Sequence, residues 1–346
     1  MSTSETRPKV AILDDYAHVA LDVADWSRVQ ARAEITVFDR HLSEEEAAIA
    51  LQPFDVICTV RERMAFPRSL IARLPNLKLI TIIGMSLPNL DMVAATEHGI
   101  VVAHPDFGPP AGANPGVNIA NATPELTWGL MIATVRHIAH ESRRMAAGGW
   151  QSTTGLVLAG RTLGLLGLGR IGKRMAQYAM AFDMPVIAWS QNLTAEAAEA
   201  VGVRYVSKDE LFAQADVLSI HVVLSDRTRG LVGARELGLM KPEAYLINTS
   251  RGPIVDEAAL IAALQEGRIA GAGIDVFDAE PPAADHPFRS MPNVTVTPHL
   301  GYVTRETLRA FYSGTIDNVA DWLGGKLTRV ANPDVLKVER RGANQP

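Results

Sequence analysis

The feature that most constrains this chain is a regular alternation of short apolar runs with stretches of helical pattern, from residue 161 to residue 299. The apolar runs are nearly continuous: TLGLLGL, PVIAWS, VRYV, DVLSIHVVL, AYLINTS, GAGIDVF and NVTVTPH. Strands read in this way when helices cover both faces of a parallel sheet. Between the runs we expect helices at 171–182, 194–200, 208–215, 234–240 and 256–266. The pattern predicts a doubly wound α/β domain.

A second series of apolar runs precedes residue 105: VAILDD, ITVFD, DVICTV, LKLITIIG and IVVAH. Because 346 residues exceed the usual size of a single core, two α/β domains are expected.

Two long helical patterns connect these domains. Residues 123–150 read as one helix, with Thr123 as its N-cap and Pro124 at its first position, and 304–325 can return the chain to the first domain. The predicted domains are therefore residues 1–121 with 304–346, and residues 122–303. The Pro- and Gly-rich segment 105–118 is interpreted as a surface loop, with a lid or dimer arm as the alternative.

Composition excludes several classes of partner. The net charge is −5 and no run of Lys or Arg occurs, which argues against a nucleic-acid or anionic-membrane surface. No segment is long and apolar enough to span a bilayer, and the first residues lack the apolar core of a signal peptide. The single cysteine, Cys58, cannot form an internal disulfide. We expect a cytoplasmic protein.

The run LGLLGLGRIGKRMA contains three glycines in the spacing G-x-G-x-x-G, between a predicted strand and a predicted helix. In this context Gly167 permits a tight turn, Gly169 lets the backbone approach a pyrophosphate, and Gly172 lets helix and strand pack closely. The helix N-terminus, at Arg170 and Ile171, supplies amide donors and a partial positive charge. The turn predicts dinucleotide binding.

Polar residues follow the last three predicted strands. Arg251 follows AYLINTS, Asp275 and Glu280 lie in GIDVFDAEP, and His299 ends NVTVTPH. The carboxyl ends of parallel strands meet at one edge of the sheet, where ligands bind. His299 can protonate a reduced carbonyl, Glu280 can favour its imidazolium form, and Arg251 can hold a carboxylate. The set predicts reduction of a 2-keto acid with a nicotinamide cofactor and without a metal ion.

At these motifs the sequence resembles the D-isomer-specific 2-hydroxyacid dehydrogenases, over about residues 50–325. The motifs are GRTLGLLGLGRIGKRMA, LINTSRGPIVDEAAL, GAGIDVFDAEP and VTPHLG. The resemblance implies a Rossmann cofactor domain, a flavodoxin-like discontinuous substrate domain, and a homodimer formed through the cofactor domains. It places the family's catalytic Arg, Glu and His on Arg251, Glu280 and His299.

The resemblance also implies further cofactor contacts. The nicotinamide amide would bind Asp275, and backbone groups around Thr249 and Ser250 would line the nicotinamide side. The family's frequent H-x-P-L reads HVVL here, which puts Val222 among the cofactor contacts.

Substrate contacts follow from the same resemblance. Backbone amides of Met85 and Ser86 would hold the substrate carboxylate, although the family often has glycine where this chain has Ser86. Arg61 matches a region that contacts the far end of some substrates.

The form of the cofactor depends on the end of the second strand of the cofactor domain. An Asp or Glu there binds the adenosine ribose and repels a 2′-phosphate. This chain has Ser190 followed by Gln191, neither of which carries that charge, and Arg170 is the nearest cation in sequence. Both cofactors are expected to work, with a lean to NADP(H).

Three functions remain open from sequence. The first is a dehydrogenase or reductase of a small 2-keto or D-2-hydroxy acid, such as glyoxylate, hydroxypyruvate or phosphohydroxypyruvate. The second is a formate- or phosphite-type dehydrogenase, although formate enzymes resemble this chain with Gln in place of Glu280. The third is a dinucleotide-sensing binding protein similar to the C-terminal-binding corepressors. The first interpretation is preferred.

Overall fold

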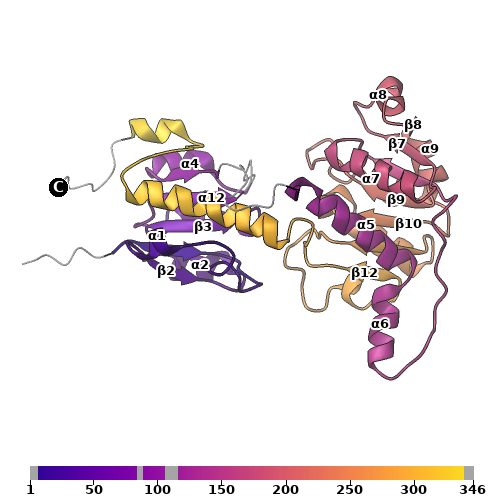
Figure 1. Cartoon of the computed structure of the whole chain (residues 1–346), viewed down its shortest axis with the longest axis horizontal. Coiled ribbons are helices and arrows are strands. Elements are labelled where there is room, and N and C mark those ends of the chain that lie inside the picture. Colours follow the sequence, from indigo (N-terminus) through magenta and orange to yellow (C-terminus); the bar gives the residue numbers. More distant parts are fainter. Residues whose placement is uncertain (1–6, 84–88, 106–115, 339–346) are drawn as a thin grey trace, which may run out of the picture. The chain divides into compact units, whose positions relative to one another are not determined.

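The computed structural model describes residues 7–83, 89–105 and 116–338. The chain forms two compact units (Figure 1). Unit 1 comprises Met1–Val117 with Arg305–Pro346, and unit 2 comprises Asn118–Thr304.

Unit 1 contains a five-stranded, all-parallel sheet with the order β2-β1-β3-β4-β5. The strands are β1 Lys9–Ile12, β2 Glu34–Val37, β3 Val56–Val60, β4 Leu79–Ile83 and β5 Val101–Ala103. This is the flavodoxin-like strand order that the family resemblance implied.

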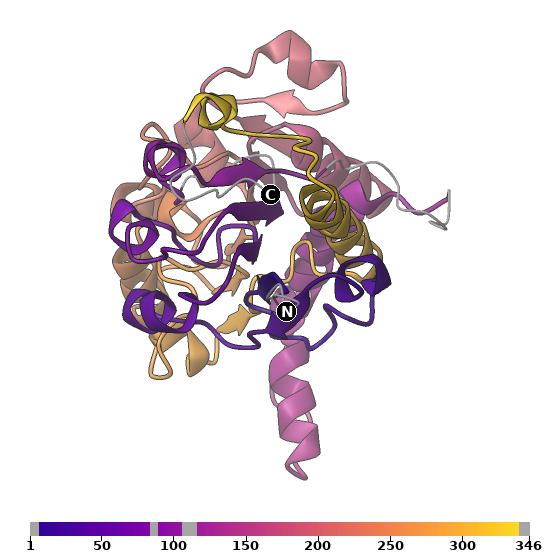
Figure 2. The same ribbon diagram turned by 90° about the vertical axis from the view of Figure 1, so that its left-hand side faces the viewer.

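Helices cover both faces of the sheet of unit 1. They are α1 Ser27–Gln30, α2 Glu44–Ala50, α3 Arg68–Ile71, α4 Met92–Glu97 and α12 Arg305–Leu323, followed by the 3-10 turn η4 Pro333–Lys337. Figure 2 shows α2, α3 and α4 on one face and α1 with α12 on the other. The side chain of Asn318 on α12 donates to the Thr81 hydroxyl on β4 at 3.0 Å. Helix α12 thus packs on the sheet that the N-terminal part of the chain forms, and its bounds agree with the predicted helix 304–325.

Unit 2 contains a seven-stranded parallel sheet with the order β12-β11-β10-β9-β6-β7-β8. The strands are β6 Leu163–Leu166, β7 Val186–Trp189, β8 Arg204–Tyr205, β9 Val217–Ile220, β10 Tyr245–Asn248, β11 Gly271–Ile274 and β12 Val294–Val296. Counted from β6, this is the Rossmann order with a seventh strand added at one edge. The order reverses between β6 and β9, so ligands are expected at the carboxyl ends of these strands.

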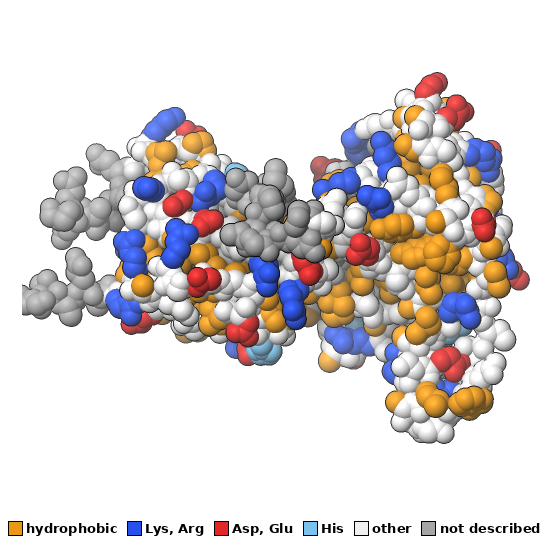
Figure 3. Space-filling view, in the orientation of Figure 1, with side chains coloured by type: hydrophobic (Ala, Val, Ile, Leu, Met, Phe, Trp, Pro, Cys, Tyr) orange, Lys and Arg blue, Asp and Glu red, His pale blue; other side chains and the backbone are white. Residues whose placement is uncertain are grey.

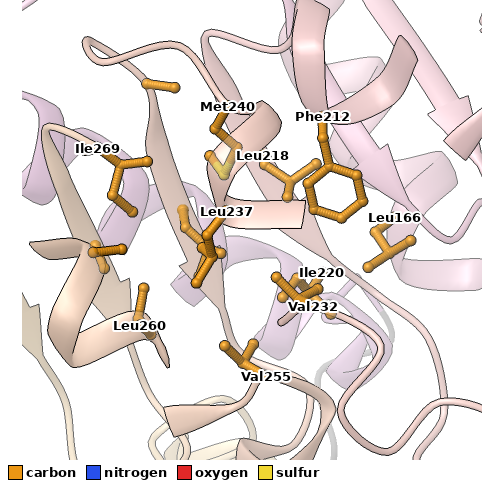
Figure 4. Close-up of a cluster of buried hydrophobic side chains, with 14 of the residues drawn as sticks. Leu166, Phe212, Leu218, Ile220, Val232, Leu237, Met240, Val255, Leu260 and Ile269 are labelled. Atoms are coloured by element: carbon orange, nitrogen blue, oxygen red, sulfur yellow. The ribbon is translucent and has the colours of Figure 1, made fainter. Parts of the chain in front are cut away.

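Helices also cover both faces of this second sheet. The helices of unit 2 are α5 Ala122–Val135, α6 Ile138–Ala146, α7 Arg170–Ala181, α8 Ala195–Glu199, α9 Lys208–Gln214, α10 Ala234–Leu239 and α11 Glu257–Gln265, with 3-10 turns η1 Ile119–Asn121, η2 Gly252–Ile254 and η3 Pro287–Arg289. α6 has no buried residue and covers neither face. One face packs α9, α10 and α11 around Phe212, Leu218 and Leu237 (Figure 4). The other face buries Leu130 and Met175 of α5 and α7. Two covered faces explain why the four central strands, β6, β9, β10 and β11, are buried at every position.

The helix expected over residues 123–150 is wrong in two respects. It is two helices, because His137 has a left-handed φ of 53° and the carbonyl of Val135 accepts from Leu156 at 3.0 Å. Thr123 is not its N-cap either, since the preceding 3-10 turn leads directly into α5 at Ala122. Among the described residues, no helix is both long and apolar enough to cross a membrane.

Candidate active site

The glycine turn between β6 and α7 has the shape of a pyrophosphate site. Gly167 has a φ of 106°, and a Cβ there would lie 2.7 Å from the carbonyl oxygen of His221. A Cβ at Gly172 would lie 2.2 Å from the carbonyl oxygen of Gly167. At Gly169 a Cβ would meet no atom within 4 Å, so the N-terminus of α7, which begins at Arg170, is open on that side. The turn therefore fits a dinucleotide.

The strands on either side bring the other predicted cofactor residues to this turn. The amide of Gly167 donates to the carbonyl of Trp189 at the end of β7, directly before the half-buried Ser190 and the exposed Gln191. On the β9 side, the hydroxyl of Ser250 donates to the carbonyl of Val222 at 2.6 Å.

His221 lies beside the same turn as a neutral group. Its Nε2 is 2.8 Å from the Ser219 hydroxyl, and burial lowers the pKa of the imidazole to about 3. The ring therefore carries no charge at neutral pH.

Arg251 lies in a turn whose own residues hydrogen-bond to one another. The amide nitrogen of Asn248 donates to the carbonyl of Arg251 at 3.0 Å, and its amide oxygen accepts from the backbone N–H of Ser250 at 3.0 Å. The Arg251 guanidinium donates to the carbonyl of Ser250 at 2.7 Å. The Thr249 and Thr127 hydroxyls are 2.7 Å apart, which ties the turn to α5.

The Arg251 turn lies directly against the segment that leads to Glu280. A Cβ at Gly252 would lie 2.1 Å from the backbone carbon of Phe277, so only glycine permits this approach. The backbone N–H of Phe277 in turn donates to Glu280 Oε1 at 2.9 Å.

Glu280 and His299 form a hydrogen-bonded pair. His299 Nδ1 lies 2.5 Å from Glu280 Oε2, and the side chains are 21% and 29% exposed. The ring of Tyr302 lies at a steep angle to the imidazole, with the centroids 5.6 Å apart. The pair is thus partly open to solvent, as a proton donor for a bound substrate must be.

Asp275 is completely buried beneath the His299 turn. Its carboxylate accepts from the Thr297 hydroxyl at 2.6 Å and from the backbone N–H groups of Leu300 and Gly301 at 2.7 and 2.9 Å. Burial raises the pKa of this carboxyl, and the hydrogen bond from Thr297 opposes the rise.

Unit 2 thus brings Arg251, Glu280 and His299 to the carboxyl ends of three adjacent strands, β10, β11 and β12. Arg61 lies in unit 1 after β3, with Nε 3.4 Å from Glu62 Oε2. The predicted contacts at Met85 and Ser86, and most of segment 105–118, lie outside the described residues.

Sequence reasoning missed Asn248 and Thr297. Asn248 was detectable in principle, because Asn before a turn commonly bonds the backbone two residues on. The bond from Thr297 joins two strands, and no local pattern shows it. Within the part of the chain that the structure describes, no group of three His, Cys, Asp or Glu side chains could hold a metal ion.

Comparison with known proteins gives a consistent result. A family model described as "D-isomer specific 2-hydroxyacid dehydrogenase, NAD binding domain" matches residues 128–301. The glyoxylate reductase of Aeropyrum pernix is 33% identical over 97% of this chain and 99% of its own. The glyoxylate/hydroxypyruvate reductase B of Yersinia pestis is 37% identical over 76% of this chain and 79% of its own.

A solved structure extends the likeness to the whole fold. The crystal structure of a candidate D-3-phosphoglycerate dehydrogenase oxidoreductase from Ralstonia solanacearum has a TM-score of 0.85 and 36% identity, and the alignment covers 96% of this chain and 98% of that one. The same family is indicated by the sheet order, by the glycine turn, by the polar residues at the strand ends and by the named relatives. The chain belongs to the D-isomer-specific 2-hydroxyacid dehydrogenases, oxidoreductases that act on CH–OH donors and carry an NAD-binding domain.

Proposed function

We propose that this enzyme reduces a small 2-keto acid, such as glyoxylate or hydroxypyruvate, to the D-2-hydroxy acid with a reduced nicotinamide dinucleotide. The observation that carries the proposal is the Glu280–His299 pair, 2.5 Å between Oε2 and Nδ1, on the same sheet edge as the Arg251 turn. The relatives named as glyoxylate and hydroxypyruvate reductases support the choice of substrate class.

Each residue of the trio has one task in this proposal. The hydrogen bond to Glu280 occupies Nδ1 of His299, so the proton passes from Nε2 to the carbonyl oxygen on which charge grows. Glu280 is fixed at its other oxygen by the Phe277 N–H, and its charge favours the imidazolium form. Arg251 holds the substrate carboxylate with its planar fork. The bound nicotinamide supplies the hydride.

The glycine turn would hold the cofactor. Gly167, Gly169 and Gly172 leave room for its pyrophosphate, and the amides at Arg170 and Ile171 would bind it. Three further positions line the nicotinamide side: Val222, Thr249 and Ser250. A direct contact between Asp275 and the nicotinamide amide stays a prediction.

Both nicotinamide dinucleotides are proposed to work, with a lean to NADP(H). Ser190 and Gln191 follow β7 without a carboxylate that would repel a 2′-phosphate, and Arg170 is exposed at the start of α7.

Unit 1 is proposed to bind the substrate. In domain terms, residues 1–121 with 304–346 would form the substrate domain and 122–303 the cofactor domain. Arg61, Met85 and Ser86 are the predicted contacts, with Arg61 directed to the far end of the substrate.

A homodimer is also proposed, formed through the cofactor units. α6 and the residues that follow it expose Met145, Trp150 and Val157, which are 60, 73 and 75% exposed. Figure 3 shows hydrophobic side chains over α5 and near the end of α6 on this face of unit 2. Buried apolar area is what stabilises such an interface.

We also propose a cytoplasmic location. The single thiol, that of buried Cys58, suits a reducing cytoplasm.

A spectrophotometric panel tests the reaction. Glyoxylate, hydroxypyruvate, phosphohydroxypyruvate and pyruvate would each be mixed with NADPH and with NADH, and formate and phosphite with the oxidised cofactors. We expect turnover with at least one small 2-keto acid. Turnover of phosphite or formate alone would contradict the proposal, and tight dinucleotide binding without turnover would favour a sensing protein.

A further inference from the structure

The two turns that carry Arg251 and His299 are each closed by a buried polar side chain from the end of the preceding or neighbouring strand. We infer that Asn248 and the Asp275–Thr297 pair are positioning residues, the first for Arg251 and the second for His299. The inference rests on the proposed function, because it assigns these two turns to substrate binding and proton transfer.

Asn248 holds the Arg251 turn through both ends of one amide. Only 2% of this residue is exposed, so water does not replace its partners. Its oxygen accepts from Ser250 N–H and its nitrogen donates to the Arg251 carbonyl, each at 3.0 Å. The backbone from which the guanidinium extends is thereby fixed on both sides.

Asp275 holds the His299 turn through three donors. The backbone N–H groups of Leu300 and Gly301 both bond its carboxylate, and the backbone N–H of His299 donates to its carbonyl at 2.9 Å. His299 itself has a φ of 52°, a left-handed conformation that a non-glycine residue keeps only where its surroundings impose it. Asp275 supplies those surroundings.

Thr297 fixes the carboxylate in turn. Its hydroxyl donates to Asp275 Oδ1 at 2.6 Å, while Oδ2 accepts from Gly301. A Cβ at Gly301 would lie 3.3 Å from both Asp275 Oδ2 and Thr123 Cγ2, so the turn has little room to shift. The buried Asp275 carboxylate thus accepts from three donors, two of which, Leu300 N–H and Gly301 N–H, belong to the His299 turn.

The Asn248 hydrogen bonds and the Asp275–Thr297 hydrogen bonds are linked to each other through the backbone. The backbone N–H of Asp275 donates to the carbonyl of Asn248 at 2.9 Å, across the ends of β10 and β11. The groups that face the His299 imidazole are the Glu280 carboxylate at Nδ1, the buried Asp275 carboxylate and the ring of Tyr302. Loss of the Thr297 hydroxyl removes a hydrogen bond that lowers the pKa of the Asp275 carboxyl, so less negative charge remains beside His299 to favour its imidazolium form. A change at Asn248 alters the carboxylate clamp instead.

Substitutions at Asn248 and at Thr297 separate the effect on the carboxylate clamp from the effect on the proton donor. Asn248→Ala should raise the KM for the keto acid about tenfold to a hundredfold and leave the pH profile of kcat unchanged, because the clamp shifts and the proton donor does not. Thr297→Val should lower kcat by a similar factor and move the pH profile to lower pH, while the keto-acid KM changes little. Thr297→Ser, which retains the hydroxyl, should recover most of the loss, whereas Asn248→Ser, whose hydroxyl can still accept from the Ser250 N–H but does not replace the donor to the Arg251 carbonyl, should recover only part of it. Thr295→Val on β12 is the matched control, since that hydroxyl is outside this network.

Two measurements do not depend on turnover. NMR titration of the His299 imidazole should show deprotonation at lower pH in Thr297→Val than in the wild type, and fluorescence titration should show unchanged dinucleotide affinity. A loss of dinucleotide affinity with an unchanged imidazole titration would overturn the positioning role and favour a direct cofactor contact. Lower melting temperatures with unchanged kinetics in both variants would also overturn it. If the wild type turns over no keto acid, the proposed function fails. The imidazole titration still tests whether the Asp275–Thr297 pair positions His299.

Discussion

His299 combines a left-handed backbone, a carboxylate at Nδ1 and partial exposure in one residue. His299→Ala is expected to lower the rate of reduction by roughly 10²–10⁴-fold, as the loss of a general acid does. Stopped-flow decay of NADPH absorbance measures it, with dinucleotide affinity as the control that the site remains folded. A variant within about threefold of the wild-type rate would remove His299 from the reaction.

Glu280 is a matched test of charge against shape. Glu280→Gln keeps the size of the side chain and removes the anion that favours the imidazolium, so the rate of reduction should fall off at lower pH than in the wild type. The pH profiles of kcat for the two proteins, measured with the same keto acid, decide the matter. Coincident profiles would show that the 2.5 Å contact has no part in proton transfer.

Ser190 tests the form of the cofactor. We expect the wild type to prefer NAD(H) by no more than about tenfold in kcat/KM, or roughly 1.4 kcal/mol, because no carboxylate at the end of β7 repels a 2′-phosphate. Ser190→Asp should turn the preference toward NAD(H). A wild type that prefers NAD(H) by about a hundredfold would mean that the repelling acid comes from elsewhere.

Residues that are proposed to act on a ligand were easier to single out from sequence than residues that bond to each other. Arg251, Glu280 and His299 could be singled out because charged groups at the carboxyl ends of parallel strands converge. Thr297 could not, since its partner Asp275 lies 22 positions away and their 2.6 Å bond exists only in the folded sheet. Met85 and Ser86 remain predictions.

At the scale of elements, strands were predicted better than helices. Both faces of each sheet are covered, so the central strands are buried apolar runs that sequence reveals, whereas the edge strand β8, Arg204–Tyr205, is exposed. The break between α5 and α6 was not predictable, because Arg136 and His137 suit a helix locally. The contact of Leu156 with the Val135 carbonyl, which redirects the chain there, is tertiary.

The β6–α7 turn gives a matched pair of glycine substitutions. Gly169→Ala should leave the melting temperature unchanged and abolish most dinucleotide binding, because the added methyl meets no protein atom and occupies the space of the ligand. Gly172→Ala should impair both, since its Cβ would lie 2.2 Å from the Gly167 carbonyl oxygen. Thermal unfolding and fluorescence titration with NADPH measure the two effects. Gly238→Ala on α10, where a Cβ meets nothing within 4 Å, is the control. Normal NADPH affinity in Gly169→Ala would mean that the pyrophosphate lies elsewhere.

At the scale of the whole molecule, the two-sheet fold follows from chain length and from two series of apolar runs. The sequence could not show how the segment after α6 is held. Glu141 accepts hydrogen bonds from Thr153 and Ser152, which lower the pKa of its carboxyl to about 2. The contribution of these hydrogen bonds to the free energy of unfolding is fully present above the ordinary pKa of 4.5 and is lost as the pH falls through about 2. At neutral pH it therefore holds the segment that exposes Trp150.

The exposed side chain of Trp150 makes the homodimer testable. The Arg144 guanidinium donates to the Trp150 carbonyl at 2.8 Å, so the indole is presented from an ordered backbone and its burial against a second copy costs little further ordering. We expect analytical ultracentrifugation to give the mass of two chains at micromolar concentration. Trp150→Glu should shift it toward one chain, since a charge would be buried in an apolar interface. Ile49→Glu, at an apolar side chain of unit 1 that is 70% exposed, should leave the mass unchanged. A wild type that sediments as one chain would rule out the dimer, and equal masses for Trp150→Glu and the wild type would place the interface away from α6.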